Sequence, residues 1–117
     1  MRALLLLLTL ALPGLAAAES VSLYTSDPAE CGTYAEGTLS DDGFFPGGEA
    51  GSLALVDPLP ISTAPDATLY EGAAVNEGNP VRIGPVIVIR EYGADGVEVV
   101  RVFTGSEPMQ ERRVCPG

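Results

Sequence analysis

The clearest alternation of apolar and polar residues lies near the C-terminal end of the chain. Two runs rich in β-branched residues, VIVIREY and VEVVRVF, flank the turn-forming residues 93–96. This pattern predicts a β-hairpin over 86–103. A turn centred on 94–95 and a turn centred on 95–96 differ in register by two residues, so both place the same side chains on one face. The predicted core face carries Ile87, Ile89, Val100 and Val102, and the predicted outer face carries Val88, Arg90, Tyr92, Val97, Val99, Arg101 and Phe103.

Weaker alternation predicts four further strands. They cover Ser20–Tyr24, Ser52–Val56, Thr68–Val75 and Arg112–Cys115. In the second of these strands, Leu53 and Leu55 should face inward. The segments DPLP (57–60) and TAPD (63–66) are expected to break the chain twice. Pro85 has no N–H to donate, so we expect a sheet edge or a bulge at that position.

A short helix is expected between the first two strands. Asp27 can cap this helix, Pro28 suits its first position, and Glu30 completes a capping box. Gly32 or Gly37 would end it, which leaves one or two turns.

Glycine and proline are spread along the chain rather than gathered in a linker. Short strands separated by frequent turns are typical of an all-β domain. We therefore expect residues 19–117 to form a single domain, a small antiparallel β-sandwich or barrel with one short N-terminal helix. The pattern leaves the choice between sandwich and barrel open.

The first 18 residues have the parts of a secretory signal peptide. They combine a positive start, an apolar run over 3–12, an interruption at Pro13-Gly14 and the small residues Ala16–Ala18. The alternative, a membrane anchor, would need roughly 20 apolar residues before a helix breaker. Cleavage after Ala18 would leave Glu19 first, with no cysteine there to carry a lipid. We expect a periplasmic or secreted protein that does not associate with a membrane once the signal is removed.

The chain has two cysteines, Cys31 and Cys115. In an oxidising compartment they are expected to form one disulfide that ties the start of the domain to its end. A redox or zinc-binding pair is disfavoured, because redox pairs are commonly C-x-x-C and a zinc site needs about four ligands.

Negative charge is concentrated in the N-terminal part of the chain. Residues 19–77 contain eleven carboxylates and no basic residue, whereas five arginines balance five carboxylates in 78–117. The formal net charge of the whole chain is −10. Such a field repels phosphate backbones, so nucleic acid is not an expected partner, whereas a basic protein is. The alternative is that the charge serves solubility alone.

The composition argues against most catalytic sites. The chain contains no histidine and no lysine, so a serine, threonine or cysteine nucleophile lacks its usual base. With sixteen carboxylates in so short a chain, a close pair of acids arises by chance and does not identify a hydrolase. We expect no enzyme activity, no cofactor and no metal.

The segment 41–49 is the candidate binding site. It is dense in turn-forming residues and is expected to be an exposed loop. It combines two adjacent phenylalanines with three acids, namely Asp41, Asp42, Phe44, Phe45 and Glu49. The phenylalanines either fold back as a lid on the core or protrude as an anchor for a partner. Calcium binding by the three acids is the less favoured alternative, because their spacing does not fit an EF-hand loop.

Three functions remain open at this point. The leading hypothesis is a non-enzymatic exported β domain that binds or supports another molecule. The second is an inhibitor of a basic secreted hydrolase, with the 41–49 segment as the inserted element. The third is a small carboxylate-dependent hydrolase.

Overall fold

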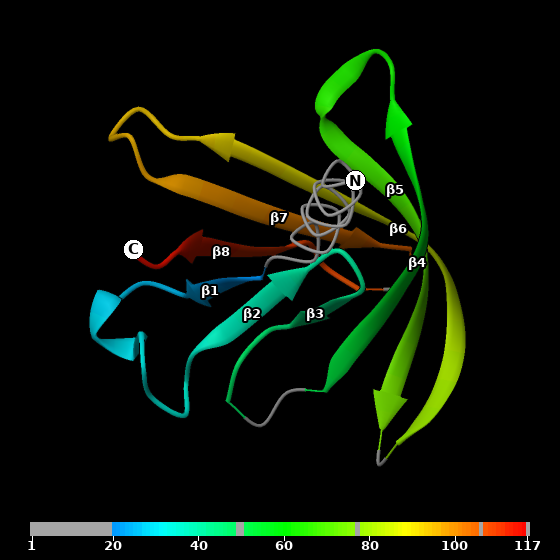
Figure 1. Cartoon of the computed structure of the whole chain (residues 1–117), viewed down its shortest axis with the longest axis horizontal. Helices are drawn as coiled ribbons and strands as arrows, with labels where there is room; N and C mark the ends of the chain where they lie inside the picture. Colours follow the sequence, from blue (N-terminus) through cyan, green and yellow to red (C-terminus); the bar gives the residue numbers. More distant parts are fainter. Residues whose placement is uncertain (1–19, 49–50, 77, 106, 117) are drawn as a thin grey trace, which may run out of the picture.

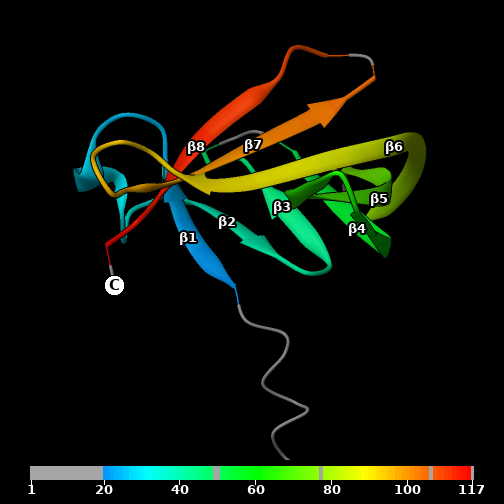
Figure 2. The same cartoon turned by 90° about the horizontal axis from the view of Figure 1, so that it is seen from above.

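The protein is a closed eight-stranded antiparallel barrel (Figures 1 and 2). The strands are β1 (Val21–Tyr24), β2 (Gly37–Ser40), β3 (Gly43–Phe45), β4 (Ser52–Ile61), β5 (Ala64–Asn76), β6 (Asn79–Tyr92), β7 (Glu98–Thr104) and β8 (Gln110–Val114). Each strand pairs with the next along the chain, and β8 pairs with β1 to close the barrel. Of the two predicted architectures, the barrel is therefore the correct one.

The computed structural model describes residues 20–48, 51–76, 78–105 and 107–116. The predicted signal peptide, its cleavage after Ala18 and the acidic residue Glu49 lie outside the described residues. Nothing in the fold tests these three predictions.

The expected chain break at 57–60 is wrong, because β4 runs through it. The expected break at 63–66 is confirmed only at Thr63, in the β4–β5 turn, because β5 begins at Ala64. The β3 strand pairs only with the first part of β4, up to Ala54. Beyond that point β4 pairs with β5 alone. The two prolines in this stretch have no N–H to donate, but no β3 strand is present there to accept a hydrogen bond. A register shift between Val56 and Leu59 also takes one proline out of the pairing. As a result, the β4–β5 hairpin extends past the barrel, opposite to the β5–β6 hairpin (Figure 1).

The predicted β6–β7 hairpin forms, but its register differs from both predicted alternatives. The Gly93 N–H donates to the Val97 carbonyl at 2.8 Å, and the Gly96 N–H donates to the Gly93 carbonyl at 3.0 Å. Gly96 has a φ of 82°, which completes a three-residue loop with a bulge. A loop with this odd number of residues moves the pairing by one residue relative to either predicted turn. Val88 consequently pairs with Val102.

This register corrects the predicted core face. Val100 and Val102 are buried as predicted, but Ile87 and Ile89 lie on the outer face and are only half-buried. Val88, assigned to the outer face from the sequence, is buried instead.

The barrel interior is filled by apolar side chains from seven of the eight strands, as is usual for a barrel of this size. The buried cluster consists of Leu23, Leu39, Phe44, Leu55, Tyr70, Val86, Val88, Val100 and Val102. Leu53 packs against it, so the inward positions predicted for Leu53 and Leu55 are confirmed. Pro85 lies beside a register shift near Gly84, which agrees with the bulge expected there.

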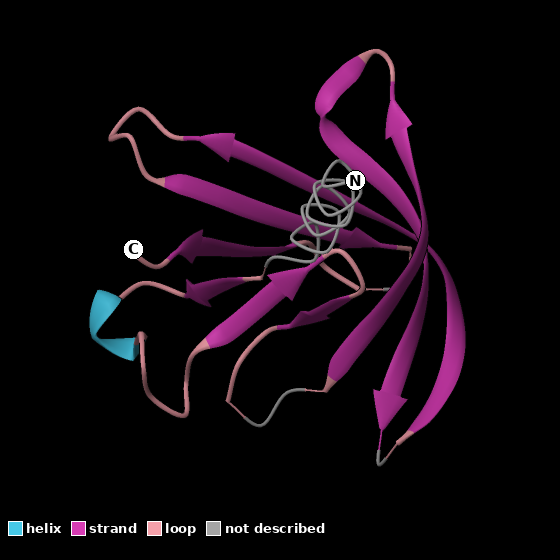
Figure 3. Cartoon of the chain, viewed as in Figure 1, coloured by secondary structure: helices cyan, strands magenta, loops and turns pink. Residues whose placement is uncertain are grey.

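The expected N-terminal helix is reduced to a single 3₁₀ turn, Pro28–Glu30, in the β1–β2 connection (Figure 3). The capping residue was identified correctly, because the Ala29 N–H donates to the Asp27 carboxylate at 2.9 Å. The helix does not continue because Cys31 already has extended backbone angles.

The disulfide between Cys31 and Cys115 is confirmed, with a Cα–Cα distance of 6.0 Å. It joins the β1–β2 connection to the residue that follows β8. This bond is consistent with an extracellular or periplasmic protein.

Candidate functional site

A cavity of about 500 Å³ opens at one end of the barrel, and we call it the mouth cavity. Its wall is formed by residues from five successive strands: Ser52, Leu53, Ala74, Ile83, Thr104 and Gln110. Pro46 from the β3–β4 connection and residues 107–109 from the β7–β8 connection complete the rim. The β7–β8 connection is the orange-to-red loop at the top of Figure 2. The volume lies within the usual range for small-molecule sites, and barrel mouths are a common place for them.

Apolar side chains continue from the mouth cavity onto the surrounding surface. Ile83 and Met109, both in the lining, are 37% and 43% exposed. Val81, which pairs with the lining residue Ala74, is 61% exposed. An apolar molecule in the cavity would cover surface that is otherwise in contact with water.

Thr104, one of the lining residues, has a hydroxyl without a hydrogen-bond partner. Its Oγ1 atom is buried, and no group among the residues that the structure describes hydrogen-bonds to it. Leaving a buried hydroxyl without a partner costs free energy, and because this oxygen has almost no accessible surface, the cost falls on the stability of the fold.

We expect Thr104→Val to raise the melting temperature, in accord with a gain of about 1 kcal/mol in unfolding free energy. The substitution keeps the shape of the side chain and removes the unsatisfied hydroxyl. Thermal unfolding followed by circular dichroism measures the effect. A lower melting temperature would show that the hydroxyl is already satisfied in the free protein.

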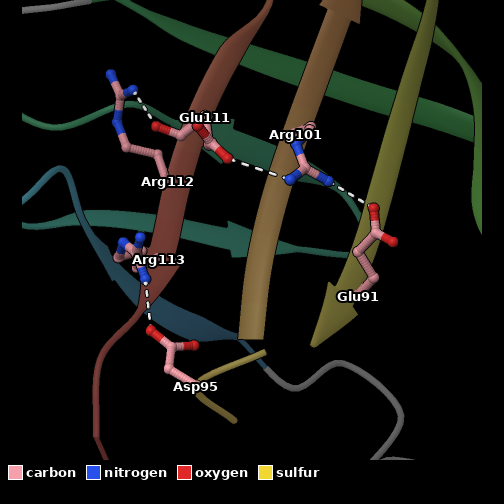
Figure 4. Close-up of polar contacts among 6 residues, drawn as sticks. All are labelled: Glu91, Asp95, Arg101, Glu111, Arg112 and Arg113. Atoms are coloured by element: carbon pink, nitrogen blue, oxygen red, sulfur yellow. Dashed lines mark hydrogen bonds and ion pairs between the residues drawn. The ribbon is translucent and has the colours of Figure 1, made fainter. Parts of the chain in front are cut away.

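Arg112 lies beside the mouth cavity on the inner face of β8, opposite the buried Val100. Its Nε donates to the Pro46 carbonyl at 3.1 Å, and its Nη2 donates to Gln110 Oε1 at 3.2 Å. Its Nη1 donates to the Glu111 carbonyl at 2.8 Å (Figure 4). These bonds join β8 to the β3–β4 connection. They also engage the oxygen of the Gln110 amide, so its nitrogen is the group that can donate to a ligand.

The opposite end of the barrel is polar. Arg90 Nε donates to the Glu98 carboxylate at 2.7 Å. This bond and the charge of Glu98 raise the pKa of Arg90. Burial raises the pKa of the nearby Tyr70 phenol, and the negative charge of Asp41 adds to the effect. The two ends of the barrel therefore differ in polarity. The polar end also has a pocket, of about 510 Å³, but charged and hydroxyl-bearing residues such as Asp95, Arg113 and Thr25 contribute to its lining.

Ion pairs neutralise several C-terminal arginines on the outer surface (Figure 4). Arg101 lies between Glu91 and Glu111, at 2.5 and 3.3 Å, and Arg113 lies 3.3 Å from Asp95. These exposed pairs contribute little to stability. Because they neutralise the arginine charges, however, the excess of carboxylates in the N-terminal half determines the electrostatic potential around the protein.

The structure brings together only part of the site predicted from residues 41–49. Residues 43–45 form β3, so the expectation of one continuous exposed loop is wrong. Asp41 and Asp42 form the β2–β3 turn, with Ser40 Oγ donating to Asp42 at 2.7 Å. Phe44 points into the core and is 1% exposed, whereas Phe45 is half-buried. Asp42 and both phenylalanines border a shallow outer hollow of about 290 Å³. Their role in binding stays a prediction.

The mouth cavity was not anticipated from the sequence. Its lining residues are ordinary strand residues, spread from Pro46 to Gln110, and no local motif links them. The one signal available was the strand alternation that places Thr104 on the same face as Val100 and Val102.

Searches against protein-family models, curated proteins and solved structures find no match to this chain. Among the described residues, no helix has the length and apolar character needed to cross a membrane. The same residues contain no group of three or more potential metal ligands of the histidine, cysteine or carboxylate types.

Proposed function

We propose that this protein is a non-enzymatic binding module that takes a small, largely apolar molecule into the mouth cavity. The observation that carries the proposal is the cavity of about 500 Å³ at the end of the barrel, lined largely by apolar side chains. Apolar walls supply affinity through burial, and a few polar groups orient the ligand. Gln110 is the polar group suited to that role, because its amide can hydrogen-bond without carrying charge.

The fold supports binding by a rigid site. Each strand that lines the mouth cavity pairs with two neighbours along part of its length, and the Cys31–Cys115 disulfide links the two ends of the domain. A site built on paired strands needs little ordering when a ligand enters, so less binding free energy is lost to entropy.

The other two functions have less support. The inhibitor hypothesis used residues 41–49 as an inserted element, but residues 43–45 of that segment lie within the barrel wall as β3. The hydrolase hypothesis has no specific pair of facing carboxylates to support it among the described lining residues, where Glu107 is the one acid.

Filling the mouth cavity should abolish binding without unfolding the protein. Ala74 faces the cavity, so Ala74→Leu places three additional carbon atoms where the ligand would lie. We expect Nile red, a neutral apolar dye, to bind the parent protein with enhanced fluorescence and to bind Ala74→Leu at least about tenfold more weakly, which corresponds to roughly 1.4 kcal/mol.

The neighbouring residue supplies a matched control. Ala73 lies on the opposite face of β5, beside the outer side chain of Arg82. Ala73→Leu makes the same chemical change outside the cavity and should leave dye binding unchanged. Equal loss in both variants, or no saturable binding to the parent protein, would overturn the proposal.

A further inference from the structure

We propose that the mouth cavity prefers apolar molecules that end in a carboxylate, and that Arg112 binds this carboxylate. The inference rests on the proposed function and adds the chemical class of the ligand. It follows from the position of the Arg112 guanidinium, from the uncharged partners that it has within the described protein and from its remaining N–H groups.

The Arg112 guanidinium lies against the wall of the mouth cavity. Gln110 and Arg112 are alternate residues of β8 that pair with two buried valines of β7, so both face the barrel interior. The Nε and Nη2 atoms of Arg112 donate to Pro46 and Gln110, and both of these acceptor residues line the cavity. A ligand that enters past Gln110 therefore approaches a cation at the inner side of the cavity.

Arg112 has no acidic partner among the residues that the structure describes. The other described arginines each form an ion pair with a carboxylate, namely Arg82, Arg90, Arg101 and Arg113. Arg112 instead donates to two backbone carbonyls and one amide oxygen, which carry no net charge. A half-buried cation without a counterion costs free energy, so an anionic ligand group is stabilised beside it.

Two N–H groups of Arg112 remain for a ligand. Each terminal nitrogen of a guanidinium carries two N–H groups, and Nη1 and Nη2 each use one of theirs within the described protein. A carboxylate has two oxygens and can accept from both nitrogens, whereas an alcohol offers a single oxygen. The amide nitrogen of Gln110 supplies a further donor. A carboxylate can therefore bind while the three existing hydrogen bonds of Arg112 stay in place.

The negative charge of the protein opposes this preference but acts at longer range. The net charge is −10, and Glu107, the one charged side chain among the described lining residues, lies on the exposed β7–β8 connection. At physiological salt, exposed charges more than about 8 Å apart are largely screened. A hydrogen-bonded contact with a half-buried guanidinium is screened much less, so we expect the contact with Arg112 to decide the preference.

Three probes of equal chain length test the preference: decanoate, decanol and decylamine. Each is titrated against bound Nile red at neutral pH, where the acid is negatively charged and the amine is positively charged. We expect decanoate to compete about tenfold more strongly than decanol, and decylamine to compete more weakly than decanol. In Arg112→Gln, decanoate should fall to the level of decanol, while decanol itself changes by less than about threefold.

Arg113→Gln is the matched control. It removes the same charge from the next residue of β8, where Arg113 pairs with Asp95 and does not belong to the described lining of the mouth cavity. This variant should keep the preference for decanoate. Equal loss of preference in both variants would show that overall charge, not Arg112, selects the ligand, and would overturn the assignment.

A measurement on the parent protein avoids any effect of the Arg112 substitution on folding. The side-chain Nε–H signal of Arg112, assigned in a two-dimensional NMR spectrum, should shift saturably with decanoate and much less with decylamine. An unchanged Arg112 signal at saturating decanoate would contradict a contact between this arginine and the carboxylate.

The outcomes also separate the inference from the proposed function. If the three probes compete equally, or decylamine competes best, the proposed ligand class is wrong while the binding site stands. If Nile red does not bind the parent protein and no probe is bound in a direct calorimetric titration, the proposed function itself fails.

Discussion

Val88→Asp unfolds the protein, whereas Ile89→Asp leaves it folded at room temperature. Val88 is 4% exposed inside the barrel, and its neighbour Ile89 is half-buried on the outer face. An aspartate at position 88 would bury a carboxylate without a partner, at a cost of several kcal/mol. That cost is comparable with the total stability of a small domain, about 5–15 kcal/mol. Circular dichroism and thermal melting of the two variants measure the difference.

The pair of variants is a direct test of the β6–β7 register, because both change a β-branched residue to the same acid. In the alternative register, with an even number of loop residues, the two positions exchange faces. An unfolded Ile89→Asp beside a folded Val88→Asp would therefore contradict the three-residue loop at 94–96.

Removing the disulfide should lower the unfolding free energy by about 4.6 kcal/mol in the chain-entropy account, since the two cysteines are 84 residues apart in sequence. The double variant Cys31→Ser, Cys115→Ser tests this value in a urea titration. The bond restricts nearly the whole chain in the unfolded state, which explains the large expected effect.

Reduction of the parent protein provides the control for this second prediction. The reduced protein and the double serine variant should unfold at the same urea concentration, because both lack the same constraint. If the reduced protein unfolds at the midpoint of the oxidised form, the bond does not stabilise the fold.

The sequence located the strongest hairpin but not its faces. The runs around residues 93–96 are rich in β-branched residues, and this local property is sufficient to predict strands. The face of each strand depends on whether the loop holds an odd or an even number of residues. The loop has three residues because Gly96 adopts a left-handed backbone conformation within a hydrogen-bonded turn. The residues GADG are compatible with more than one turn type, so the sequence alone does not determine the number of loop residues.

The proline-containing segments illustrate a second limit. DPLP resembles a break when each residue is considered alone, yet it lies on a stretch of β4 without a partner on the β3 side. Whether a proline breaks a strand depends on the neighbour that would accept its hydrogen bond. The short length of β3 is a property of the assembled sheet, and residues 57–60 do not encode it locally.

The candidate site shows the same dependence on the whole fold. Phe44 and Phe45 were conspicuous as adjacent aromatic residues, but strand alternation sends Phe44 into the core. The mouth cavity has no counterpart in any local motif, because residues from five strands line it together. Local chemistry therefore identified the disulfide, whereas the cavity required the closed barrel.

The central claim is that the mouth cavity receives an apolar ligand. The most direct test is a two-dimensional amide NMR titration of the protein with decanol, a neutral probe with an apolar chain. We predict saturable shifts concentrated at the wall of the cavity, at Leu53, Ala74, Thr104 and Gln110. Shifts centred instead on the outer groove beside Val56 and Ala73, or no saturable shifts at all, would contradict the claim.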